Sequence, residues 1–158
     1  MNAHTPQSQA AHKSRFVYAT YIRTTPERLW QALTSPEFIK QYWFGMDVEA
    51  EWKPGGAWAL KFTDGRLADA GQIVELEPQK RLVIRWRNEW SPELNAEGWS
   101  LCVMEIEPEA DAVKLTVTHS IDREDSKLIP AVSGGWPKIL SNLKSLLETG
   151  TVVLAAKH

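Results

Sequence analysis

The sequence is poor in cysteine and holds no long hydrophobic run. Its 158 residues include one cysteine, Cys102, so no disulfide can form within the chain. A lone thiol is typical of proteins kept in a reducing compartment, which predicts a cytoplasmic location. Because no run of about 18 apolar residues is present, we expect no membrane-spanning helix. The opening letters MNAHTPQSQAAHKS lack the apolar stretch of a secretory signal, so we expect residues 1–14 to form a disordered tail.

An excess of charge and the common catalytic motifs are also missing. The 18 basic and 20 acidic residues give a net charge of −2, which predicts no binding to nucleic acid and none to an anionic membrane. The sequence contains no P-loop, no dinucleotide-binding glycine pattern, no zinc-type spacing of cysteine and histidine, and no GxSxG motif. We therefore expect no metal and no cofactor, and we favour a binding role over an enzymatic one.

Aromatic residues, in contrast, are plentiful, and 8 of them are tryptophans. The apolar fraction of 43% is that of an ordinary globular protein. The length suits one domain, which we expect to span residues 15–150, followed by a short tail at 151–158.

The apolar pattern predicts an α+β fold. A β-prone segment at 15–23 is followed by two short helices, because Thr25 and Ser35 each precede a proline, the arrangement that caps a helix and opens its first turn. After Asp47 the apolar residues alternate, and short turns separate the alternating segments, which predicts an antiparallel meander. The expected strands are residues 47–52, 57–62, 68–77, 81–87, 99–107 and 112–120.

A long helix is predicted near the end of the chain. Apolar residues recur at spacings of three and four from Trp136 onward, and Gly150 is a natural helix end. The glycines at 134–135 interrupt the chain before this series, so we expect the helix to begin near Trp136, with Pro137 in its first turn. Asn142 is expected on the polar, outward side. A single apolar stripe predicts that the helix lies across the concave face of the sheet.

Five segments together resemble a known family. They are IRTTPERLWQALTSPEFIKQYW, WKPGGAWAL, GQIVELEPQKRLVIRWR, VKLTVTHS and GGWPKILSNLKSLLETG. In this order they resemble the C-terminal-like domain of activators of the heat-shock-protein-90 ATPase, within the START-like (SRPBCC) helix-grip superfamily. The resemblance implies a curved antiparallel sheet of about seven strands around the C-terminal helix, often with an elongated apolar cavity between them. It indicates no single activity, because such folds carry many functions.

Aromatic and aliphatic side chains on one face of the expected sheet are typical of a ligand-binding cleft. The same pattern fits a filled core, and both interpretations stay open. The residues expected to contact a ligand are Trp58, Leu60, Phe62, Leu82, Ile84, Trp86, Val117, His119 and Leu140, with Trp43, Phe44, Trp99 and Trp136 at the rim.

His119 is the leading candidate for chemistry, with Glu105 or Tyr42 as distant second candidates. It ends an inward-facing apolar series, where an imidazole orients a ligand or transfers a proton near neutral pH. A hydrogen-bonded core histidine is the competing interpretation. Cys102 is interpreted as a buried structural thiol, since no base accompanies it. Arg85 and Arg87 are expected on the solvated face of the sheet, and docking of an acidic partner is the alternative.

Three functions remain. The leading hypothesis is binding of a hydrophobic or aromatic small molecule in a cavity between the sheet and the C-terminal helix. The second, which the resemblance implies, is a chaperone partner that activates the heat-shock-protein-90 ATPase in the stress response. The third is an enzyme of the cyclase, dehydratase or hydrolase type that uses the same cavity. The edges of the expected sheet are exposed, so the association of two chains into a homodimer is also an open alternative.

Overall fold

The computed structural model describes residues 13–155. Most of the expected tail at 1–14 and the end of the expected tail at 151–158 lie outside the described residues. The elements run in the order β1 (Ser14–Ile22), α2 (Pro26–Thr34), α3 (Pro36–Tyr42), β2 (Asp47–Ala50), β3 (Ala57–Lys61), β4 (Leu67–Glu77), β5 (Arg81–Asn88), α4 (Pro92–Asn95), β6 (Ser100–Glu109), β7 (Ala112–Ile121) and α5 (Leu128–Thr149).

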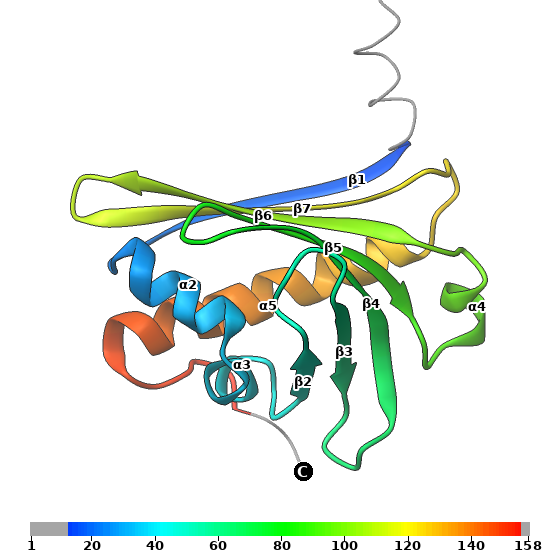
Figure 1. The fold of residues 1–158 in the computed structure, drawn as a ribbon, viewed down its shortest axis with the longest axis horizontal. Helices are drawn as coiled ribbons and strands as arrows, with labels where there is room; N and C mark the ends of the chain where they lie inside the picture. Colours follow the sequence, from blue (N-terminus) through cyan, green and yellow to red (C-terminus); the bar gives the residue numbers. More distant parts are fainter. Residues whose placement is uncertain (1–12, 156–158) are drawn as a thin grey trace, which may run out of the picture.

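Seven strands form one antiparallel sheet in the order β1-β7-β6-β5-β4-β3-β2. Figure 1 shows the sheet curving over the long helix α5, with α2 and α3 on the same side of the sheet as α5. The predicted α+β helix-grip architecture is confirmed, with the segment at 15–23 placed as the edge strand β1 beside β7. The two short helices begin at the expected prolines, and the Thr25 hydroxyl accepts a hydrogen bond from the Arg28 N–H at 3.2 Å.

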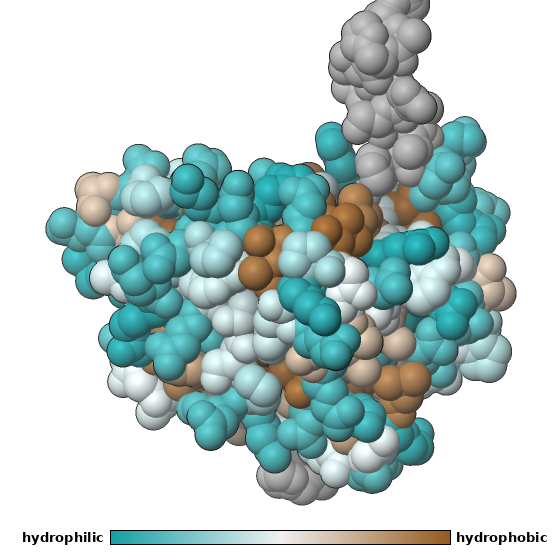
Figure 2. Space-filling view, in the orientation of Figure 1, coloured by the Kyte–Doolittle hydropathy of each residue, from teal (hydrophilic) through white to brown (hydrophobic). Residues whose placement is uncertain are grey.

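The core lies on the concave face, between the sheet and α5. Ile84, Cys102 and His119 are register neighbours on β5, β6 and β7, and all three are buried there. Burial raises the pKa of the Cys102 thiol above its usual range, so the thiol stays protonated and unreactive at neutral pH. On the face of the molecule that Figure 2 shows, hydrophobic side chains form small groups separated by hydrophilic ones.

Helix α5 begins at Leu128, earlier than predicted. The prediction that the glycines at 134–135 break the chain is wrong, because α5 runs through them, and Pro137 lies inside the helix rather than in its first turn. A proline at this position removes the intrahelical hydrogen bond to the carbonyl of Ser133. The first turns form nevertheless, because Leu128 is buried against the sheet side and the helix start is held from outside, as described below.

The prediction that Asn142 faces outward is also wrong. The side chain is fully buried. Its Nδ2 donates to the carbonyl of Leu154 at 2.8 Å and to that of Tyr42 at 3.4 Å, and its Oδ1 accepts from the N–H groups of Val153 and Leu154 at 3.0 and 2.7 Å. A buried amide with its hydrogen bonds satisfied is stable inside a protein. Asn142 therefore fastens the segment after α5 to the helix.

Gly71 in β4 makes room for two tryptophans. Its register partners are Trp58 on β3 and Trp86 on β5, and the centroids of these two rings lie 4.5 Å apart. A Cβ atom at Gly71 would lie 1.6 Å from the carbonyl oxygen of Arg85. Since backbone atoms cannot yield to such an overlap, glycine is required here.

Gly71→Ala is expected to lower the free energy of unfolding by about 2–4 kcal/mol, because the new methyl group overlaps the backbone of β5. Urea unfolding measures this change. Gly134→Ala is the matched control: a Cβ there meets no atom within 4 Å, and replacing a helical glycine raises stability by about 0.5–1 kcal/mol. A Gly71→Ala protein as stable as the wild type would contradict this packing.

Candidate functional site

A pocket of about 210 Å³ lies beneath the first half of α5. Leu128, Val132 and Gly135 line it from α5, and the facing residues come from the end of α3, from β4 and β5 and from the segment containing α4. Figure 1 shows α4 and the start of α5 at the same end of the molecule. The pocket therefore sits at one end of the space between the sheet and α5.

Trp86 stands at the centre of an aromatic cluster beside this pocket. Its ring centroid lies 6.0 Å from that of Trp43, 4.5 Å from that of Trp58 and 5.9 Å from that of Trp136, and the rings of Trp43 and Trp136 meet edge to face at 5.2 Å. Trp43, Trp86 and Trp136 also border a second hollow, toward Leu60, in which only about 20 Å³ is free. We call these three residues the tryptophan wall, because they separate a filled core from the open pocket.

His119 is buried against the tryptophan wall with both ring nitrogens engaged. The Nε1–H of Trp136 donates to its Nδ1 at 3.1 Å. An indole N–H only donates, so Nδ1 is an acceptor and the ring proton of the neutral imidazole is on Nε2. That proton is directed at the hydroxyl of Ser100, 2.9 Å away, which donates to the carbonyl of Trp86 at 2.9 Å. His119 thus fixes the position of Trp136.

Burial also decides the charge of His119. The side chain has no exposed surface, and desolvation lowers the pKa of the imidazole to about 3. The ring is therefore neutral at physiological pH, and its one lone pair is occupied by Trp136. In this arrangement His119 acts as a positioning residue and lacks a free nitrogen with which to accept a proton from a ligand.

Asp69 brings a carboxyl group to the pocket. Its register partners are Leu60 on β3 and Asn88 on β5, which places it on the concave face. Burial raises the pKa of Asp69 to about 6; a hydrogen bond with the Trp86 side chain opposes the rise, and the nearby charge of Glu89 adds to it. The group is therefore mostly ionised at neutral pH and gains a proton in mildly acidic solution.

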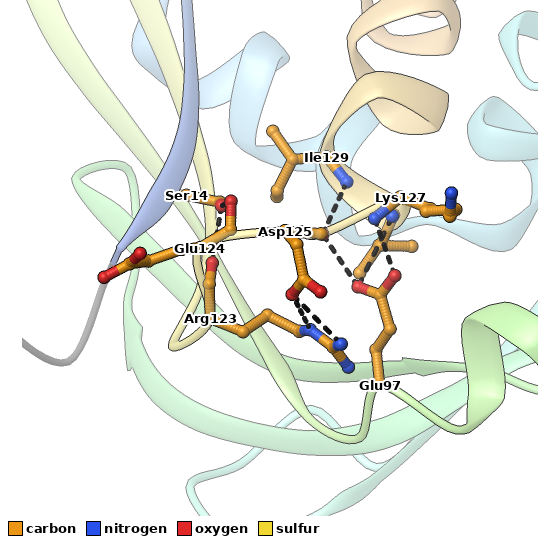
Figure 3. A network of polar contacts seen from close by, with 9 residues as sticks. Ser14, Glu97, Arg123, Glu124, Asp125, Lys127 and Ile129 are labelled. Carbon is orange, nitrogen blue, oxygen red and sulfur yellow. Dashed lines mark hydrogen bonds and ion pairs between the residues drawn. The ribbon is translucent and has the colours of Figure 1, made fainter.

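Glu97 joins the two walls of the pocket. Its carboxylate accepts hydrogen bonds from the N–H of Lys127 at 2.6 Å, from the N–H of Leu128 at 3.4 Å and from the hydroxyl of Ser126 at 2.7 Å. Figure 3 shows this carboxylate at the start of α5, near the Arg123–Asp125 pair. A carboxylate stabilises the unsatisfied N–H groups at a helix start. This contact holds the first turn of α5 against the segment that follows α4.

The structure separates the predicted ligand contacts into three groups. The tryptophan wall lines the open pocket, whereas Trp58, Leu60, Leu82, Ile84, Val117 and Leu140 are buried in the filled core. Phe44, Phe62 and Trp99 lie elsewhere. Phe44 borders an open hollow beside residues 153–155, Phe62 lies under the guanidinium of Arg66, and Trp99 lies on the outer face under Arg85 and Arg87.

Several lining residues escaped the sequence reasoning although their signals are present. Asp69 alternates with Gly71 and Ile73, which face inward, so its phase in β4 places it inside. Ser91 and Pro92 repeat the cap-and-proline device of the earlier helices, and they open α4. The apolar stripe of α5 extends back through Val132, which favours an earlier helix start. The two glycines and Pro137 nevertheless led to the prediction that the helix begins near Trp136. The remaining members missed are Asn88, Trp90, Leu94, Leu128, Ala131 and Ile139.

Within residues 13–155, no cluster of three His, Cys, Asp or Glu side chains is arranged to hold a metal ion. Across the same residues, no helix is long and apolar enough to cross a membrane.

Asp69→Asn is expected to remove a pH dependence of stability. The pKa of Asp69 is higher in the folded protein, about 6, than in the unfolded chain, so folding is favoured by the neutral acid and this contribution is lost as the pH rises from about 4 to about 6. Relative to Asp69→Asn, the wild type should lose about 1–3 kcal/mol over that range in urea unfolding.

The depressed pKa of His119 works in the opposite direction, because the unfolded chain binds its proton more tightly, so stability falls as the pH drops from about 6.5 toward 3. Both proteins carry His119, so this effect cancels in the difference. A difference between the two proteins that stays constant from pH 4 to 6.5 would contradict the burial of the Asp69 carboxyl.

Solved structures with the same fold are similar to this chain. The protein MLL2253 from Mesorhizobium loti has a TM-score of 0.74 and 24% identity, over 85% of this chain and 96% of that one. The Aha1 dimer from Colwellia psychrerythraea has a TM-score of 0.71 and 20% identity, over 87% and 98%. The HSP90 activator PFC0360w from Plasmodium falciparum has a TM-score of 0.68 and 21% identity, over 84% and 95%. At these identities the likeness is one of fold.

A comparison with curated protein sequences finds no match. The family model described as "Activator of Hsp90 ATPase homolog 1-like protein" matches residues 23–148, which include all of the pocket lining. On this match, the chain belongs to the family of proteins like the activator of Hsp90 ATPase homolog 1.

Proposed function

We propose that this protein binds a small hydrophobic or aromatic molecule in the pocket beneath the first half of α5. One observation carries the proposal: a hollow of about 210 Å³ remains open directly beside a core that is otherwise filled. Its lining is almost entirely apolar or aromatic, with a few polar groups on one side, which is the usual composition of a ligand site.

The size of the pocket limits the ligand. An apolar cavity of about 150 Å³ holds benzene, so this pocket suits a molecule of one or two rings rather than a long acyl chain. The tryptophan wall blocks extension of the ligand toward Leu60 and Leu140. The elongated cavity that the family resemblance implied is thus reduced here to its end near α4.

Two other functions have less support. An enzyme that uses His119 for proton transfer needs a free ring nitrogen, and both are occupied. Activation of a chaperone ATPase rests on the description of the family model and on the names of structures under 25% identical, and no surface feature within residues 13–155 favours it. Addition of the protein to an Hsp90-type ATPase assay tests this alternative.

The buried thiol of Cys102 fits a reducing compartment such as the cytoplasm.

Gly135→Leu is expected to abolish ligand binding. Gly135 lines the pocket, and a Cβ there meets no atom within 4 Å, so the longer side chain extends into the open volume. Against a panel of one- and two-ring aromatic compounds, measured by thermal shift and then by calorimetry, affinity should fall more than about ten-fold.

Gly134→Leu is the matched control, because Gly134 is exposed, does not line the pocket and also has open space around its Cβ. Its affinity should stay within about two-fold of the wild type. A panel in which no compound binds the wild type, or equal losses in both variants, would exclude this pocket as the ligand site.

A further inference from the structure

We infer that the preferred ligand of this pocket is an organic ammonium ion with a one-ring apolar body, whose charge lies beside Asp69 and against the surrounding indole rings. The inference rests on the proposed function and narrows it to one class of ligand. Its basis is an acidic group and an aromatic lining that occur together in the same hollow.

Asp69 gives the pocket a negative charge that no protein cation balances. Among the described residues that line the pocket, it is the only ionisable one. The described ion pairs do not include it. A partly buried carboxylate in an apolar surrounding is costly unless a cation or several hydrogen bonds accompany it.

Arg87, which precedes the register partner of Asp69 on β5, is already engaged. Glu89, whose charge reaches Asp69, accepts a hydrogen bond from the guanidinium of Arg87 at 2.6 Å and from the amide of Asn95 at 3.3 Å. Arg87 therefore pairs with Glu89, the carboxylate outside the pocket lining. The other elements around Asp69 present uncharged groups: Leu60 is its register partner on β3, and Leu94 from α4 and Leu128 from α5 line the pocket.

Indole rings add a second attraction for a cation. The tryptophan wall and Trp90 put four indoles on the lining. Trp is the best of the side chains at attracting cations through the face of its ring, and the attraction grows where water is excluded. Aromatic lining combined with a carboxylate is a chemistry that recognises substituted ammonium groups, whereas the same carboxylate repels an anion.

Three probes of similar size distinguish charge from shape: benzylammonium, benzyl alcohol and benzoate. Calorimetry at pH 7.5 compares them on the wild type and on Asp69→Asn, which keeps the shape of the side chain and removes its charge. On the wild type, benzylammonium should bind about ten-fold more tightly than benzyl alcohol, and benzoate should bind more weakly than either. On Asp69→Asn, the preference for benzylammonium should fall to about two-fold or less.

The outcomes separate this inference from the proposed function. If benzyl alcohol binds the wild type as tightly as benzylammonium, the pocket is a ligand site but the ammonium preference is wrong. If the preference persists in Asp69→Asn, its source lies elsewhere and the role of Asp69 is overturned. If none of the probes or the wider aromatic panel binds, both proposals fail. The wild-type comparison alone tests the inference should Asp69→Asn prove unstable.

Discussion

The hydrogen bond from the indole N–H of Trp136 to His119 determines where the core of this protein ends. His119 lies near the end of β7, the strand beside the edge strand β1, and Trp136 lies inside α5, so the bond sets how the helix lies on the sheet. Burial keeps the imidazole neutral, because desolvation disfavours the charged ring and lowers its pKa. Ser100 and the carbonyl of Trp86 complete the chain of donors and acceptors. Every polar atom in this part of the core has a partner, which makes the arrangement specific.

The position of Trp136 divides α5 into two parts with different tasks. After Trp136 the helix packs on a filled core and is fastened by Asn142 to the segment at 153–154. Before Trp136 the helix covers the pocket, carries two glycines and is held at its start by Glu97. Because Gly71 has no side chain, the rings of Trp58 and Trp86 meet above it and fill the space over the middle of the sheet. The open volume is left at the end where α4 and α5 begin.

The fold was largely predictable from the sequence, and the site was predictable only in part. Period-two alternation and the proline-capped helices are local signals, so the strands, α2 and α3 followed from them. The start of α5 could not be predicted from local signals, because its first turn depends on Glu97, a residue distant in sequence. Whether the space beneath α5 is full or empty depends on how large side chains pack, and the same pattern of tryptophans fits both. The inward-facing position of Asp69 could be predicted from the alternation along β4. The residues that surround it in the pocket could not, because they come from β5, α4 and α5.

The tryptophan wall separates a filled core from the open pocket in which we propose that a ligand binds. The most direct measurement is a titration with a one-ring aromatic ligand, followed through the indole N–H signals of the 8 tryptophans in a nitrogen-15 NMR spectrum. This arrangement predicts that the signals of the wall and of Trp90 move together and saturate, while those of Trp30 and Trp99, which do not line the pocket, stay in place. Signals that move only outside the pocket lining, or none that move at saturating ligand, would contradict it.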